Sequence, residues 1–213
     1  MNNNNVFKPL LKESINVTIQ HDDGRVNSIV DEEKVIDLMK KVYGLNNVEE
    51  PPPRHWYDVK VKGVPVQIKS TEGGTDNFSS KKAILWALTD MSFEEIEDLT
   101  RLSWKRFENL LVSRKCLNNG RDYDIICVNK STGKMTYMTL KTLSDLKSNG
   151  SNLPFQVPWK KNWEKGMIAR TNSESYDFIV GKYYDSVVKK TQQHSLSLIK
   201  QSLSNNYTNT ISR

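Results

Sequence analysis

Cysteine is scarce in this chain, which has only Cys116 and Cys127 among its 213 residues. Two are too few for a disulfide framework or a zinc cluster, so we expect two buried thiols in a reduced, intracellular protein. Long apolar runs are missing too, and without a run of about 18 apolar residues we expect no membrane span. The N-terminal stretch "MNNNNVFKPL" lacks the apolar core and cleavage site of a secretory signal. These absences together predict a cytoplasmic protein.

Several catalytic signatures are also absent. The histidines His21, His55 and His194 lie too far apart in the sequence to form a metal-ligand motif. The G-x-G-x-x-G and P-loop patterns are missing, which argues against ATP-driven chemistry, and there is no G-x-S-x-G elbow. What the chain does have is a formal net charge of +6. That excess of basic residues favours a polyanionic partner such as nucleic acid.

The order of predicted elements favours one domain over residues 1–213, with a frayed N-terminal segment and a polar tail after Asn205. Hydrophobic content of 37% and charged content of 26% are ordinary for a globular protein. Apolar spacing, caps and turns predict helices over 28–45, 79–90, 91–115 and 175–203, strands over 56–71, 121–130 and 134–143, and irregular chain over 46–55, 70–79 and 148–163. The frayed segment is expected over 1–12, a capping box of Ser92 and Glu95 begins the helix over 91–115, and "STG" is a hairpin turn between the last two strands. This order indicates an α/β or α+β fold in which a mixed sheet is flanked by helices.

The most informative stretch is "WYDVKVKGVPVQIKST", residues 56–71, which alternates as a β-hairpin does. Lys62-Gly63 is a plausible two-residue turn, with glycine where a positive φ is needed. That turn would place Val61 opposite Val64. One side of the hairpin is then expected to be apolar and to carry the side chains of Tyr57, Val59, Val61, Val64, Val66 and Ile68.

The same register would place polar side chains together on the other side of the hairpin. Asp58 falls opposite Gln67, and Lys69 lies two residues further along the same face. Asp58 can bind a hard cation such as Mg²⁺, while the amide oxygen of Gln67 and the carbonyl of Ile68 can add further ligands. Lys69 could orient a water molecule or stabilise charge on a phosphate. The alternative is a solvated surface hairpin whose lysines protect an exposed edge.

Asp58, followed after eight residues by Gln67-Ile68-Lys69, resembles the motif of the PD-(D/E)XK nuclease superfamily. The resemblance covers roughly residues 26–90. Tyr57 stands where the family motif has proline, and Gln67 replaces the second carboxylate, a variant that looks like the one in Mrr-like members. The resemblance implies a Mg²⁺-dependent nuclease in which Asp58, Gln67 and Lys69 form the catalytic centre.

Many members of that superfamily carry a further glutamate in the first helix. Glu32 is the candidate here, with Asp31 and Glu33 as competitors, and all three alternatively serve only to favour the helix N-terminus. The wider layout is similar to that of small type II restriction endonucleases. It implies a central mixed sheet of about five strands flanked by helices, a homodimer, and cleavage of double-stranded DNA at a palindromic site. A structure- or modification-specific DNA nuclease and a non-catalytic DNA-binding module remain alternatives.

Candidate DNA contacts follow the hairpin. A helix N-terminus with polar side chains is a natural phosphate contact, although Ser79 could equally be only the helix cap. The stretch "PFQVPWKKNWEK" could also follow a DNA backbone, although its tryptophans Trp159 and Trp163 could instead belong to the core. Before the hairpin, Arg54 and His55 are either phosphate contacts or a surface basic pair. The residues expected to bind DNA are Asn77, Ser79, Ser80, Lys81 and Arg54.

Overall fold

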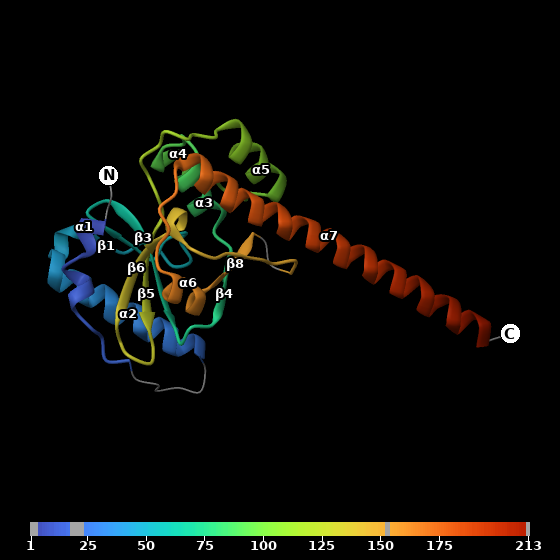
Figure 1. Ribbon diagram of the computed structural model, residues 1–213, viewed down its shortest axis with the longest axis horizontal. Coiled ribbons are helices and arrows are strands. Elements are labelled where there is room, and N and C mark those ends of the chain that lie inside the picture. The colour runs from blue at the N-terminus through green and yellow to red at the C-terminus, as the bar shows by residue number, and fades with distance from the viewer. Residues whose placement is uncertain (1–3, 18–23, 152–153, 212–213) are drawn as a thin grey trace.

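The computed structural model describes residues 4–17, 24–151 and 154–211 (Figure 1). Its larger sheet has five strands in the order β1-β2-β3-β5-β6. The strands are β1 (Val48–Glu49), β2 (Val59–Val61), β3 (Val64–Thr71), β5 (Asp124–Asn129) and β6 (Met135–Thr139). β3 and β5 run parallel, whereas the other neighbours run antiparallel. The predicted α/β architecture with a five-stranded mixed sheet is therefore confirmed.

The β2–β3 hairpin has the predicted register, in which Val61 pairs with Val64. Lys62 and Gly63 form its turn with φ values of 52° and 78°, and two positive values characterise the turn whose twist suits a hairpin. Beyond the strand, the backbone N–H of Asp58 donates to the carbonyl of Val66 at 3.0 Å, one residue out of register. Because of this offset, Tyr57 joins the core on the opposite side of the sheet from the valines, and the expectation that it shares their side is wrong.

The helix predicted over 28–45 is α2 (Gly24–Tyr43), and it covers the apolar side of the hairpin. The chain before it is ordered rather than frayed: α1 (Asn4–Phe7) and the 3-10 turn η1 (Leu10–Lys12) precede the helix. Phe7 is fully buried and stacks on Tyr137 of β6 with ring centroids 5.2 Å apart. The expected fraying of residues 1–12 is thus contradicted from Asn4 onward, because apolar side chains in this segment cover the sheet.

Three helices cover the other side of the sheet: α3 (Lys81–Leu88), α4 (Phe93–Glu97) and α5 (Trp104–Ser113). The predicted capping box between Ser92 and Glu95 is present at the start of α4. The single helical stretch expected over 91–115 is nevertheless split in two. Arg101 has a φ of 45°, which an α-helix cannot include, and the side chain of Ser103 then caps α5 by accepting from Arg106.

Two segments expected to be irregular contain strands. β4 (Thr75–Phe78), β8 (Phe155–Pro158) and β7 (Lys147–Ser148) form an antiparallel sheet in the order β4-β8-β7, followed by α6 (Trp159–Lys165). Phe78 pairs with Phe155 across this sheet, and their rings stack with centroids 5.2 Å apart. These strands are short and pair over a long sequence separation, so local alternation did not reveal them.

The remaining elements are the 3-10 turns η2 (Leu45–Asn47) and η3 (Leu140–Thr142) and the long helix α7 (Asn172–Ile211). The first turns of α7 are anchored in the core by Tyr176, Ile179 and Tyr183, and the helix then projects away from the body of the protein (Figure 1). In the described ranges, no helix combines the length and apolar character that crossing a membrane requires. Cys127 is buried as predicted, whereas Cys116 is only half-buried.

Candidate active site

Asp58 is held in place by two donors from β3. The backbone N–H of Ile68 donates to its Oδ2 at 2.6 Å, and the side-chain amide of Gln67 donates to the same oxygen. Burial raises the pKa of Asp58, while the charge of Lys69 and these hydrogen bonds lower it in part. The carboxylate is therefore desolvated and rigidly oriented, which is the condition in which it interacts most strongly with a nearby positive charge.

Glu32 on α2 is electrostatically coupled to the same group. Burial and then the negative charge of Asp58 raise the pKa of Glu32 to about 7, and Lys69 acts in the opposite direction. Helix α2, the residue preceding β2, and β3 thus bring Glu32, Asp58 and Lys69 together. Lys69 pairs with Cys127 of β5 and lines the cavity, so it is not a solvated lysine on the surface of a hairpin.

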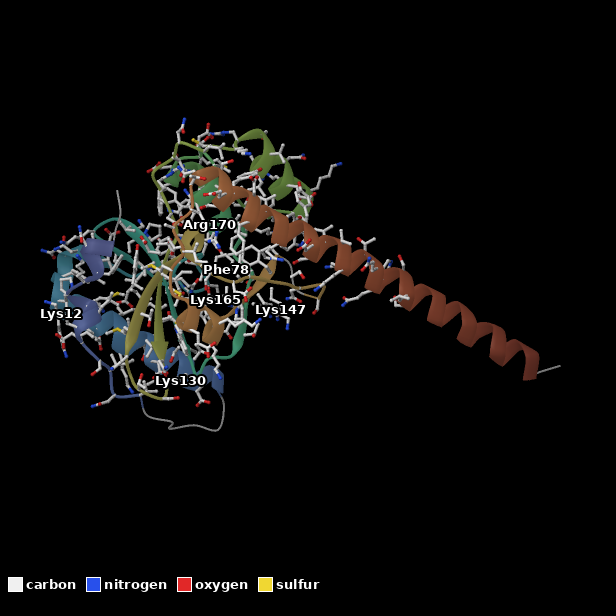
Figure 2. All side chains as sticks on the ribbon, viewed as in Figure 1. Lys12, Phe78, Lys130, Lys147, Lys165 and Arg170 are labelled. Atoms are coloured by element: carbon white, nitrogen blue, oxygen red, sulfur yellow. The ribbon has the colours of Figure 1, made fainter. Side chains whose placement is uncertain are left out.

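The competing acids of the first helix lie elsewhere. Asp31 is 1% exposed and accepts a hydrogen bond from the hydroxyl of Ser70 at 2.6 Å. Its Oδ2 also lies 3.7 Å from the ammonium group of Lys130, which Figure 2 shows near α2. Glu33 is exposed to solvent. Glu32 is thus the candidate that is coupled to Asp58 and Lys69, whereas Asp31 joins α2 to β3 and to Lys130, which follows β5.

Gln67 lies beside Asp58, as the hairpin register predicted, and the nitrogen end of its amide faces the carboxylate. Its nitrogen donates to Asp58 and lies 3.5 Å from the carbonyl oxygen of Ile68. Its oxygen instead lies 3.1 Å from the hydroxyl of Tyr123. The nitrogen of the amide faces Asp58 in this arrangement, because a carboxylate only accepts hydrogen bonds and so pairs with the N–H end of the amide.

A cavity of about 470 Å³ opens beside these side chains and is lined by Asp58, Gln67 and Lys69. It also gathers all the residues expected to contact DNA: Arg54, Asn77, Ser79, Ser80 and Lys81. The tertiary structure therefore brings Asp58, Gln67 and Lys69 together with the suggested binding residues around one opening, whereas Glu32 is not among the residues that line it.

Some of those candidate DNA contacts are already engaged within the protein. Ser80, rather than Ser79, caps α3 by accepting from the backbone of Ala83. Lys81 donates to the carbonyl of Leu102, and its ammonium group lies 4.5 Å from the ring centre of Trp104. Because these contacts use the polar groups of Ser80 and Lys81, both residues are weaker candidates for phosphate binding than the exposed Arg54 and Ser79.

Asn77 and the tryptophans of α6 also have internal roles. The side-chain oxygen of Asn77 accepts from Asn149 at 2.9 Å and from Gln156 at 3.0 Å. Trp159 is buried and donates to Asp76 at 2.6 Å, while Trp163 packs at the edge of the same core. The core interpretation of both tryptophans is therefore the correct one, and "PFQVPWKKNWEK" does not present them to a ligand.

Sequence reasoning missed Tyr123 altogether and considered His55 only as a phosphate contact or a surface residue. Tyr123 reaches the site because β5 pairs in parallel with β3, a long-range contact that leaves no local signature. His55 lines the cavity, and its Nε2 lies 2.9 and 3.0 Å from the two carboxylate oxygens of Glu97. The side chain of Trp56 donates to that same carboxylate.

The donor set suits a hard divalent cation. Glu32 and Asp58 are partly desolvated carboxylates, and the charge of Asp58 makes ionisation of Glu32 less favourable unless a cation compensates. Across the described ranges, no group of three His, Cys, Asp or Glu side chains could hold a metal ion. A Mg²⁺ ion at Glu32 and Asp58 would therefore need oxygens from the carbonyl of Ile68, the amide of Gln67 or water.

The chain was compared with protein families, with curated proteins and with solved structures, and nothing matches it in any of the three. The chemistry of the site therefore carries the functional proposal.

Proposed function

We propose that this protein is a Mg²⁺-dependent DNA endonuclease of the type II restriction class, built on a restriction-endonuclease-like fold. The observation that carries the proposal is that Asp58 and Lys69 line one cavity and that the charges of both act on Glu32, which α2 supplies. Two acids and a lysine in such an arrangement are the groups that metal-assisted phosphodiester hydrolysis requires.

Each side chain has a distinct role in this proposal. Glu32 and Asp58 hold Mg²⁺, with Gln67 and the carbonyl of Ile68 as further ligands. The bound ion would polarise the scissile phosphate and lower the pKa of a coordinated water molecule. Lys69 orients the attacking water or stabilises negative charge that develops on the phosphate. The hydrogen bond from the backbone N–H of Ile68 keeps the carboxylate of Asp58 in one orientation, so this carboxylate needs little reorganisation when substrate binds.

Double-stranded DNA is the proposed substrate, and the net charge of +6 supports a polyanionic ligand. Arg54 and Ser79 on the cavity rim are proposed to contact the phosphate backbone. A homodimer would give each half of a palindromic site the same protein surface, and each subunit would cut one strand. A cytoplasmic location is part of the same proposal, because cellular DNA is reached there.

The test is cleavage of long unmodified duplex DNA by the purified protein, with Mg²⁺ or with a chelator. Discrete fragments that require Mg²⁺ are expected, and Asp58→Asn should abolish them. Asp37→Asn is the matched control, because this carboxylate lies on α2 with a side chain that is 70% exposed, and it should leave cleavage unchanged. Full cleavage by a folded Asp58→Asn protein would reject the assignment. A smear would instead indicate a structure-specific or repair nuclease.

A non-catalytic DNA-binding module is the second candidate. It is favoured by the Gln67 amide, which presents nitrogen rather than oxygen to Asp58 and so withholds one potential metal ligand. Binding of duplex DNA that is independent of Mg²⁺, without cleavage of unmodified or modified DNA, would support this candidate. Cleavage of modified DNA alone would instead identify a modification-dependent nuclease.

A further inference from the structure

Tyr123 directly precedes β5, is fully buried, and places its hydroxyl between two acceptor oxygens. The hydroxyl lies 2.6 Å from the backbone carbonyl oxygen of Trp56 and 3.1 Å from the amide oxygen of Gln67. Burial, and after it the charge of Asp58, raises the pKa of Tyr123 well above its usual value, so the hydroxyl keeps its proton. A phenol has only one hydrogen to donate. Tyr123 therefore cannot satisfy both oxygens at the same time.

The amide of Gln67 has a second orientation in which the single hydroxyl hydrogen of Tyr123 is sufficient. A half-turn about its last side-chain bond exchanges the oxygen and the nitrogen while the rest of the residue stays in place. The amide N–H then donates to the hydroxyl oxygen of Tyr123, and the hydroxyl donates its hydrogen to the carbonyl of Trp56. Every polar atom at this end of the amide now has a partner, which buried polar groups require.

The other end of the exchanged amide would present its oxygen to Asp58 and to the carbonyl of Ile68. Three acceptor oxygens at one place repel one another unless a cation lies among them, and oxygen ligands of these types are the ones that Mg²⁺ takes. The preferred orientation of Gln67 therefore depends on two opposing contacts. Asp58 favours the nitrogen when no cation is bound, whereas Tyr123 favours the oxygen-inward orientation.

We propose that Tyr123 is a positioning residue that turns the amide oxygen of Gln67 toward Asp58 when a divalent cation binds. This inference rests on the proposed function, because the cation site belongs to that proposal. Through Tyr123, the neutral Gln67 takes the part of the carboxylate that usually stands at this position of the family motif. Tyr123 itself touches neither the cation nor the substrate.

The first test measures Mg²⁺ binding by calorimetry in the absence of DNA. Tyr123→Phe removes the acceptor that Gln67 needs in the oxygen-inward orientation, so Mg²⁺ should bind roughly five- to tenfold more weakly, as expected for one lost hydrogen bond. Tyr137→Phe is the matched control. Tyr137 is a buried tyrosine of β6, and its hydroxyl donates to Asp124 at 2.6 Å rather than to Gln67. The Tyr137→Phe protein should therefore bind Mg²⁺ with the same affinity as the wild type.

A double-mutant cycle with Gln67→Glu separates positioning from a general structural effect. A carboxylate has oxygen at both ends, so there is no orientation for Tyr123 to select. In the Gln67→Glu background, Tyr123→Phe should change Mg²⁺ affinity by less than about twofold. NMR supplies a second readout: the side-chain amide resonance of Gln67, identified by its loss in Gln67→Glu, should shift on addition of Mg²⁺ and shift less in Tyr123→Phe.

The outcomes distinguish the two proposals. Equal Mg²⁺ affinity in the wild type and in folded Tyr123→Phe would overturn the positioning role and leave the proposed nuclease standing. If Tyr123→Phe weakens Mg²⁺ binding equally in the wild type and in Gln67→Glu, the positioning role is also overturned, because the effect is then structural. If the wild type binds no Mg²⁺, or if Asp58→Asn leaves binding unchanged, both proposals fail.

Discussion

The two faces of β3 differ in what holds them in place. On the face toward α2, Val66 and Ile68 are buried in an aliphatic cluster that includes Val59 and Val61. The opposite face presents Gln67 and Lys69 to Asp58 and to the cavity. The first face is stabilised by many non-directional contacts, whereas the second depends on a few directional ones. Stability and chemistry are therefore carried by alternate residues of one strand and should be separable by mutation.

Lys69→Ala should have the largest effect, and it should lower the rate of DNA cleavage while leaving stability nearly unchanged. Loss of the ammonium group removes charge stabilisation at the phosphate, and we expect the single-turnover rate of DNA cleavage to fall by roughly 10²–10³-fold. The free energy of unfolding should change by less than about 1 kcal/mol, because Lys69 contributes little to the aliphatic cluster. Lys134→Ala, at an exposed lysine, is the control and should keep the wild-type rate. An unchanged rate in Lys69→Ala would show that the two faces are not divided in this way.

Ile68→Ala should do the opposite, because it should lower stability while leaving the cleavage rate of the folded protein nearly unchanged. The side chain of Ile68 is 3% exposed in the aliphatic cluster, and truncating it should lower the free energy of unfolding by about 3 kcal/mol, measured by urea denaturation. Its backbone N–H and carbonyl are retained, so the folded fraction should still cleave DNA at close to the wild-type rate. A large loss of activity in fully folded protein would contradict the separation of the two faces.

Glu32→Gln should change how stability depends on pH. The folded protein raises the pKa of Glu32 from 4.5 to about 7, so the neutral carboxyl is favoured in the folded state. Its contribution to stability is fully present below pH 4.5 and is lost as pH rises through 7. Without Mg²⁺, Glu32→Gln should therefore equal the wild type near pH 4 and be more stable above pH 7, by about 1 kcal/mol because water still screens the site.

Addition of Mg²⁺ should reverse the order of the two proteins above pH 7, because the cation stabilises the ionised carboxylate of Glu32 but not an amide. Thermal denaturation across this pH range, with and without Mg²⁺, provides the measurement. Asp37→Asn, at an α2 carboxylate whose side chain is 70% exposed, should follow the wild type under all of these conditions. If Asp37→Asn and Glu32→Gln behave alike, Glu32 has no special relation to Asp58.

The smallest effect is expected at the turn that sets the register of both faces. Lys62 adopts a φ of 52°, which is costly for a lysine and easier for asparagine, so Lys62→Asn should raise the free energy of unfolding by about 0.5 kcal/mol. Gly63→Ala should lower it by about 1 kcal/mol. A Cβ at Gly63 would meet no atom within 4 Å, so that loss would come from the φ of 78° alone. Chemical denaturation measures both, and activity should be unaffected.

Local patterns were sufficient wherever the determining interactions lie close together in the sequence. The turn at Lys62 and Gly63, the pairing of Val61 with Val64, and the capping box of α4 were all predicted and are present. Helix α2 and the β5–β6 hairpin were also predicted. In each case a few neighbouring residues fix the backbone conformation, and the alternation of side chains then fixes which ones are buried.

Predictions failed where a distant segment decided the outcome. Nothing in residues 70–79 indicates that β4 will pair with β8, about 80 residues later, and the ordering of α1 depends on Phe7 meeting Tyr137. Contacts between distant segments depend on how the packed elements meet, and a short sequence window contains no information on that. The placement of Tyr57 failed for a local reason, because the out-of-register hydrogen bond from Asp58 to Val66 within the hairpin breaks the alternation that the prediction assumed.

The sequence by itself determined that Asp58, Gln67 and Lys69 share one face of a hairpin, because strand alternation and a two-residue turn leave little freedom. It left open which acid of the first helix accompanies them and which end of the Gln67 amide faces Asp58. Only the tertiary structure decided these points, by packing α2 so that Glu32 is coupled to Asp58 and by pairing β5 with β3 so that Tyr123 reaches Gln67. The physical reason is that alternation along a strand is a local geometric constraint, whereas hydrogen-bond partners and electrostatic neighbours depend on which distant elements pack together.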